Sequence, residues 1–173
     1  GSRIPPGQEE AMGQVAAKTS IPIATGERLT TKYEFFRLLQ AGGASILQMN
    51  VGRCGGLLEG KKIASLAEAF YAQIAPHLYN GPIGAAASFQ LAACTPNFLI
   101  QESIGTWDGF HAEILKKPLH WEDGYIIPSS EPGLGVELDM DVVRRHSPYT
   151  DERLHLQMGP DPVDVKDTAP AKG

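Results

Sequence analysis

The sequence has few of the features that mark secreted, membrane or nucleic-acid-binding proteins. It contains two cysteines, Cys54 and Cys94, too few for a disulfide framework, which favours a reducing, cytoplasmic location. Both are expected to be small buried residues. No apolar run approaches the roughly 18–20 residues that a membrane span needs, so no membrane partner is expected. The 15 basic and 20 acidic side chains form no runs, so no nucleic-acid partner is expected either.

What the chain does contain is the composition of an ordinary globular protein. Of its 173 residues, 42% are hydrophobic and 20% are charged, and this length allows about one domain with a buried core. The 19 glycines and 13 prolines predict many turns. Residues 1–3 are set aside, because Gly1-Ser2 is typical of what remains after a purification tag is removed.

Helical and strand-like patterns alternate along the first hundred residues. Apolar residues at helical spacing predict helices over residues 8–18, from about 31 to 41, 57–72 and 84–93. Short apolar runs between them predict strands over residues 21–24, 45–49, 73–76 and 97–101. Strands joined by connections of this length are parallel, so the pattern predicts an α/β fold with a parallel sheet.

The spacing of the strands is compatible with two kinds of α/β fold. The strands begin about 25 residues apart, as in a (β/α) barrel of about 250 residues, of which four units would be half. A small open doubly wound sheet fits the same spacing. Residues 121–158 are different: they predict turns, short antiparallel pieces and a brief helix capped by Asp139. The organisation predicted is four βα units of a barrel over residues 4–120, a C-terminal return segment over 121–158, and a disordered tail over 159–173.

Four polar side chains follow the predicted strands at their carboxyl ends. They are Glu27, Asn50, His77 and Glu102. Working groups in parallel α/β folds lie at these ends, so the four are predicted to converge on one rim. Each also has an ordinary structural explanation. The two carboxylates could be solvated or cap a turn, the asparagine could make a turn, and the histidine could be a structural core residue.

Five groups of short motifs carry a resemblance to a known family. They are IATGERL at 23–29, ILQ at 46–48 with GG at 55–56, APH at 75–77 with GPI at 81–83, LIQE at 99–102 and PGLGV at 132–136. In this order and spacing, over about residues 4–145, the chain resembles the C-terminal half of the enolase superfamily barrel. The similar group is the mandelate racemase and muconate lactonizing enzyme type, with its sugar-acid dehydratases such as galactonate dehydratase.

The resemblance implies an enzyme that removes a proton α to a carboxylate and stabilises the enediolate on Mg²⁺. It implies that Glu27 is one of three metal carboxylates, that His77 is a general acid or base, and that Glu102 hydrogen-bonds the substrate carboxylate. Asn50 stands where the family has an aspartate that orients the histidine. A carboxamide can orient the ring but carries no charge to stabilise an imidazolium, so His77 is expected to serve mainly as an acid.

The resemblance also implies that about half of the enzyme is not in this chain. The family has an N-terminal capping domain and four earlier barrel strands, which carry the other metal carboxylates and the second acid or base. We expect that half in the same or a second chain, and this chain to be inactive alone. Two parallel edge strands would otherwise be left open, so the chain is expected to seat against the missing half or to form a homo-oligomer.

The expected reaction is dehydration of a sugar or hydroxy acid. Racemisation or cycloisomerisation by the same superfamily remains an alternative, as does a structural fragment with no catalysis of its own. A flavodoxin-like nucleotide-binding sheet ranks last, because no GxGxxG or P-loop motif follows a strand.

Overall fold

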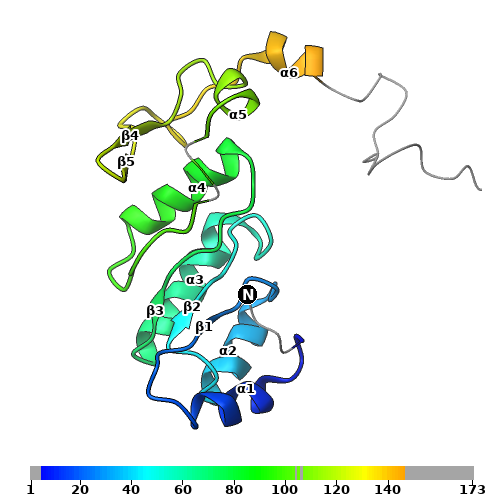
Figure 1. Ribbon diagram of the computed structural model, residues 1–173, viewed down its shortest axis with the longest axis vertical. Coiled ribbons are helices and arrows are strands. Elements are labelled where there is room, and N and C mark those ends of the chain that lie inside the picture. Colours follow the sequence, from blue (N-terminus) through cyan, green and yellow to red (C-terminus); the bar gives the residue numbers. More distant parts are fainter. Residues whose placement is uncertain (1–4, 104, 106, 147–173) are drawn as a thin grey trace, which may run out of the picture. The chain divides into compact units, whose positions relative to one another are not determined.

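A computed structural model describes residues 5–103, 105 and 107–146 of the chain (Figure 1). Helices and strands alternate along it, as predicted. The helices described are α1 Glu9–Ala16, α2 Lys32–Gln40, α3 Gly56–Ala69, α4 Pro82–Ala93, α5 Phe110–Glu113 and α6 Met140–His146. The strands described are β1 Ala24–Thr25, β2 Ile46–Leu47, β3 Gln73–Ile74, β4 His120–Glu122 and β5 Tyr125–Ile127.

The first three strands form a parallel sheet in the order β1-β2-β3. Phe98 extends it through a parallel bridge to Ile74 of β3. These four consecutive parallel positions, each pair joined through a helix, confirm the predicted barrel-type α/β fold. The regular strands are shorter than the apolar runs predict, and residues 97–101 form the bridge alone. Backbone bonds nevertheless carry the pairing toward the carboxyl ends, as where His77 N donates to Met49 O at 3.1 Å.

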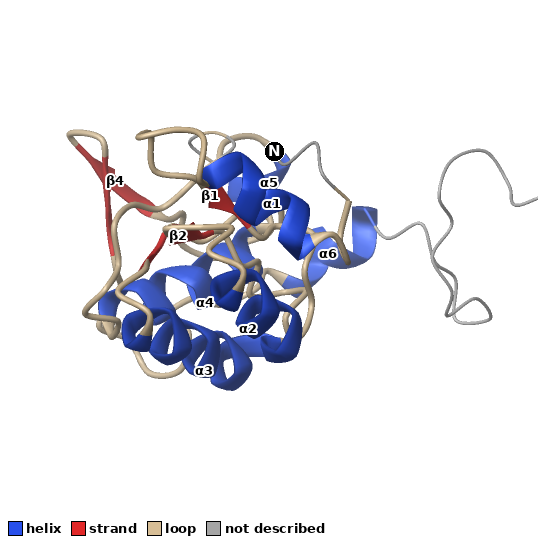
Figure 2. Cartoon of the chain, turned by 90° about the horizontal axis from the view of Figure 1, so that it is seen from below, coloured by secondary structure: helices blue, strands red, loops and turns tan. Residues whose placement is uncertain are grey.

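The core lies between the sheet and the helices that follow its strands. Figure 2 shows α2, α3 and α4 side by side along one face of the sheet, and α3 contacts both of its neighbours. Phe35 of α2, Leu47 of β2, Ile63 of α3 and Ile74 of β3 are completely buried there. Each such burial contributes about 1.5–3 kcal/mol, so this interface stabilises the sheet and positions its carboxyl ends.

Helix α2 begins with a capping box three residues beyond the turn that carries Glu27. The Thr31 hydroxyl accepts a hydrogen bond from Glu34 N at 3.3 Å, and Glu34 Oε2 accepts one from Thr31 N at 2.7 Å. Burial alone would raise the pKa of the Glu34 carboxyl. The bonds that it accepts from the backbone and hydroxyls of Thr30 and Thr31 reverse that effect, and its pKa is lowered.

The segment after the sheet contains the short antiparallel pieces that were predicted. Strands β4 and β5 pair with His120 opposite Ile127 and Glu122 opposite Tyr125. Asp123 and Gly124 join them, with φ of 48° and 82°, the left-handed backbone that a two-residue hairpin turn of type I′ needs.

The contacts of the chain divide it into two units, with the second beginning at Asp139. Asp139 Oδ1 accepts hydrogen bonds from Asp141 N at 3.0 Å and Val142 N at 3.1 Å, which confirms the predicted N-cap of α6. The predicted tail over residues 159–173 lies outside the described residues.

The two cysteines, both expected to be buried, differ in their exposure. Cys54 is buried as expected, and burial raises the pKa of its thiol. The same expectation is wrong for Cys94, which is exposed just after the end of α4. Over the described residues, no helix combines the length and the apolar character that crossing a membrane requires.

Candidate active site

The predicted site residues all lie just beyond the carboxyl ends of the parallel strands. Glu27 follows β1 by two residues, Asn50 follows β2 by three, His77 follows β3 by three, and Glu102 follows the Phe98 bridge by four. Neighbouring parallel strands end at the same edge of a sheet. The short strands therefore place these side chains on one rim, as in other parallel α/β proteins.

Asn50 and His77 are in direct contact. Asn50 Nδ2 lies 3.0 Å from His77 Nδ1, and the backbone N–H of His77 holds the adjacent strand end through its bond to Met49 O. Asn50 is 2% exposed, whereas the His77 side chain keeps 23% of its surface exposed. The buried carboxamide therefore contacts a ring that is still partly exposed.

Asn80 completes this arrangement, and the sequence analysis did not find it. Its carboxamide pairs with that of Asn50 through two bonds, Asn80 Nδ2 to Asn50 Oδ1 at 3.0 Å and Asn50 Nδ2 to Asn80 Oδ1 at 3.3 Å. Asn80 lies just before α4, in the loop after His77. Its proximity to the GPI motif at 81–83 was a local signal that could have pointed to it.

Glu102 lies on the other side of the His77 ring. Its Oε2 accepts a hydrogen bond from Leu78 N at 2.9 Å and lies 3.9 Å from His77 Nε2. The preceding residue, Gln101, donates to Pro76 O at 2.9 Å and accepts from the Ser88 hydroxyl at 2.9 Å. These bonds tie the end of the fourth strand position to the loop after β3, so Asn50, His77 and Glu102 are brought together.

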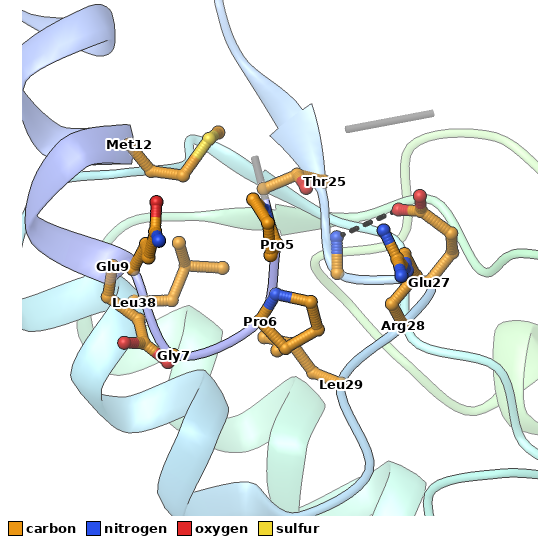
Figure 3. A pocket seen from close by; sticks show the side chains of 12 residues that line it. Pro5, Pro6, Gly7, Glu9, Met12, Thr25, Glu27, Arg28, Leu29 and Leu38 are labelled. Carbon is orange, nitrogen blue, oxygen red and sulfur yellow. Dashed lines mark hydrogen bonds between the residues drawn. The ribbon is translucent and has the colours of Figure 1, made fainter. Parts of the chain in front are cut away.

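Glu27 lies on the turn after β1 and contacts the backbone of that turn. Its Oε2 accepts a hydrogen bond from Gly26 N at 3.3 Å, shown by the dashed line in Figure 3. The adjacent pocket is lined by residues of the N-terminal segment, α1, β1 and α2, with Glu9 and Glu27 on opposite sides. Glu9 is buried, and its Oε1 has no hydrogen-bond partner among the described residues.

The acidic side chains that the structure describes do not form a metal site by themselves. Within residues 5–103, 105 and 107–146, no three His, Cys, Asp or Glu side chains are grouped so as to hold a metal ion. Mg²⁺ needs several oxygen ligands in near-octahedral geometry, and Glu27 supplies one carboxylate. A complete Mg²⁺ site therefore does not fit the described residues alone.

The family comparison agrees with this partial barrel. Residues 4–142 match the family model described as "Enolase C-terminal domain-like". The chain belongs to this enolase C-terminal domain-like family. The matched residues include all four strand ends, so the enolase-type rim is the part of the family that this chain contains.

Individual relatives show the same resemblance. The chain is 42% identical to a D-galactonate dehydratase of Cronobacter sakazakii over 156 residues, which are 86% of this chain and 41% of that enzyme. A Burkholderia SAR-1 protein of the mandelate racemase/muconate lactonizing enzyme type is 81% identical, with a TM-score of 0.82, and the match covers 97% of this chain and 42% of that one.

A more distant member of the enolase family carries ligands in its crystal structure. The Agrobacterium radiobacter enolase, with bound Na and L-malate, is 30% identical, with a TM-score of 0.76, over 82% of this chain and 40% of that one. This chain thus spans about two fifths of the length of the relatives that it matches.

Proposed function

We propose that this chain is part of a dehydratase for sugar or hydroxy acids, whose barrel is completed by protein that the chain does not contain. The observation that carries the proposal is the meeting of Asn50, His77 and Glu102 at one rim of an enolase-type sheet. The D-galactonate dehydratases among its relatives support an acid sugar as the substrate class.

The proposed reaction removes one molecule of water from the substrate. The α C–H bond breaks and its proton goes to a base, which we place in the missing half. The β C–O bond then breaks, the leaving hydroxide becomes water by taking the proton back from that base through solvent, and an enol of a keto acid remains. His77 Nε2 would face the departing hydroxyl and assist its loss, while Glu102 would hydrogen-bond the substrate carboxylate.

The proposal includes Mg²⁺, held at a site whose ligands would come from both this chain and the missing half. When bound, the metal would offset the negative charge that develops on the enediolate. Glu27 would contribute one oxygen, and the other carboxylates would come from the missing half, because the described residues hold no group of three. This chain's own part is to hold one carboxylate in place on the turn after β1.

Exposed apolar residues at the open edge of the sheet support a partner that pairs with this edge. Leu99 and Ile100 follow the Phe98 bridge and are 45% and 63% exposed, although the same run reads as a buried strand in the sequence. An open parallel edge of this kind invites pairing with another strand. We propose that the missing half, in the same or a second chain, covers it.

The test is an assay of the complete enzyme with His77→Ala. Turnover of acid sugars should fall by about 10²–10⁴-fold, because a group that assists C–O cleavage would be lost, while Mg²⁺ binding should persist. His120→Ala, which removes an exposed histidine on β4, is the matched control and should leave turnover unchanged. Normal turnover by His77→Ala would remove His77 from the reaction.

A further inference from the structure

The carboxamide of Asn50 is hydrogen-bonded at every position that it offers. Its Oδ1 accepts from Gly52 N at 2.9 Å and from Asn80 Nδ2 at 3.0 Å. Its Nδ2 faces Asn80 Oδ1 at 3.3 Å and His77 Nδ1 at 3.0 Å. Two lone pairs and two amide hydrogens are thus all in use, and at 2% exposure water cannot substitute for any of them.

The backbone of Gly52 decides which way this carboxamide points. If the side chains of Asn50 and Asn80 both turned over, the two bonds between them would be preserved, so the amide pair alone permits either direction. A backbone N–H can only donate. In the turned arrangement the Asn50 NH₂ would face the Gly52 N–H, so two donors would oppose each other and the Gly52 N–H would lose its acceptor, which is unfavourable.

Two glycines leave the space that Asn80 needs to reach Asn50. A Cβ on Gly52 would lie 2.7 Å from Asn80 Nδ2, and a Cβ on Gly84 would lie 2.7 Å from Asn80 Cβ. Both distances are shorter than real side chains allow. The Asn80 side chain occupies the space beside both glycines, which accounts for the absence of a Cβ at these two positions.

We propose that Gly52 and Asn80, acting through Asn50, hold His77 with its proton on Nε2. The Asn50 NH₂ donates to Nδ1, so Nδ1 must offer a lone pair, and a proton there would point at the amide hydrogens. The N–H of the ring is then at Nε2, on the side of Glu102. Gly52 and Asn80 are positioning residues, since they act on His77 through Asn50.

The position of the proton limits what His77 Nε2 can do in the reaction. This consequence rests on the proposed function. A ring with Nε2–H donates a hydrogen bond to an oxygen that gains negative charge, such as a departing hydroxyl. It cannot take up a proton at the same atom. The orientation of Asn50 therefore favours dehydration over a racemisation in which His77 removes the α proton.

The tautomer is measured by NMR on protein labelled with ¹⁵N at its histidine rings, without substrate or metal. The chain has five histidines, and His77→Gln identifies the His77 signals. In the neutral ring we expect a bare Nδ1 and a protonated Nε2, which have widely separated ¹⁵N shifts. A proton on Nδ1 in the unaltered protein would overturn the proposal, whatever the variants do.

Asn50→Asp tests the cause of the tautomer. A carboxylate accepts from Gly52 N and from an Nδ1–H, so the proton should move to Nδ1 in most molecules. Gln14→Glu adds the same charge at an exposed site on α1 and should change nothing. A ring that keeps Nε2–H in the Asn50→Asp variant would contradict the assigned role of Asn50.

Gly84→Ala tests the contribution of Asn80 without altering Asn50. The added methyl group displaces the Asn80 carboxamide, so the fraction of the Nδ1–H form should rise while Gly52 still favours Nε2–H. An unchanged fraction would remove Asn80 from the proposal. Failure of the proposed function is separate: an active His77→Ala enzyme together with Nε2–H would overturn the dehydratase role and leave the tautomer assignment standing.

Discussion

The two sides of the candidate site differ in how much of their support this chain supplies. Around His77, contacts come from the loop after β2, the loop after β3 and the segment leading to Glu102, through Asn50, Asn80 and Leu78. Around Glu27, the hydrogen bond from Gly26 N comes from the same turn. One side is a partly buried network between loops that follow different strands, and the other includes a bond within a single turn.

The difference bears on how the proposed reaction would be divided between this chain and the rest of the barrel. A network that satisfies its own buried polar groups keeps its geometry without outside help. A single carboxylate cannot provide the several oxygen ligands that Mg²⁺ needs. In the proposed reaction, the hydrogen-bond donor would thus be positioned within this chain, whereas the metal site would need further ligands from protein outside it.

The largest difference between the two sides is expected in the binding of Mg²⁺. Titrated with Mg²⁺, this chain alone should show no saturable binding, whereas the complete enzyme should bind it. In the complete enzyme, Glu27→Gln should weaken binding by at least the roughly 10–100-fold seen for outer-shell changes, measured by calorimetry. Glu122→Gln, on the exposed hairpin strand β4, is the control and should bind normally. Tight binding by this chain alone would contradict the shared-site proposal.

The two sides should also differ in how much they contribute to the free energy of unfolding. Asn50→Leu removes the hydrogen-bond partner of Gly52 N and of the partly buried Asn80 carboxamide, so the free energy of unfolding should fall by about 1–3 kcal/mol. Glu27→Gln should change it by less than about 1 kcal/mol, because an amide oxygen can still accept from Gly26 N. Urea denaturation of the two variants measures both values, and equal losses would show that the sides are supported alike.

The smallest effect is expected at the cap of α2, near Glu27. Glu34→Gln should lower the free energy of unfolding by about 0.5–1 kcal/mol at neutral pH, because the charged partner of the capping box is lost. The pKa of Glu34 is lowered in the folded chain. Its stabilisation is therefore complete above the unfolded pKa and is lost as the pH falls through the folded pKa.

Two measurements check the cap prediction. The stability gap between Glu34→Gln and the unaltered chain should close on acidification, and a gap that persists below pH ~3 would contradict the charged cap. The NMR signals of His77 should not move in this variant, since its network lies in other loops. A shift of those signals would show that the two sides of the site are coupled.

Much of the fold could be predicted because it follows from local regularities. Helical spacing and apolar runs predict the alternation, and crossovers of this length require parallel strands. The same logic placed Glu27, Asn50, His77 and Glu102 on one rim, since side chains after parallel strands share an edge. Their catalytic roles stay predictions, as do the domain boundaries at residues 120 and 158.

Other features could not be predicted because they depend on contacts between distant segments. The strands are shorter than their apolar runs because pairing, and not hydrophobicity, sets their ends. The exposure of Cys94 depends on where α4 ends against its neighbours. The pairing of Asn80 with Asn50 could not be predicted because the two are thirty residues apart, and the adjacent GPI motif marks the position of Asn80 but not its partner.

The amino-acid sequence by itself determined the order of the elements, the family and the identity of the groups at the strand ends, because these depend on periodicity and motif spacing. Only the tertiary structure decided which atom of each group faces which neighbour. The direction of the Asn50 carboxamide is the main example: its two ends are nearly the same size, and a single backbone N–H, brought into range by the fold, distinguishes them.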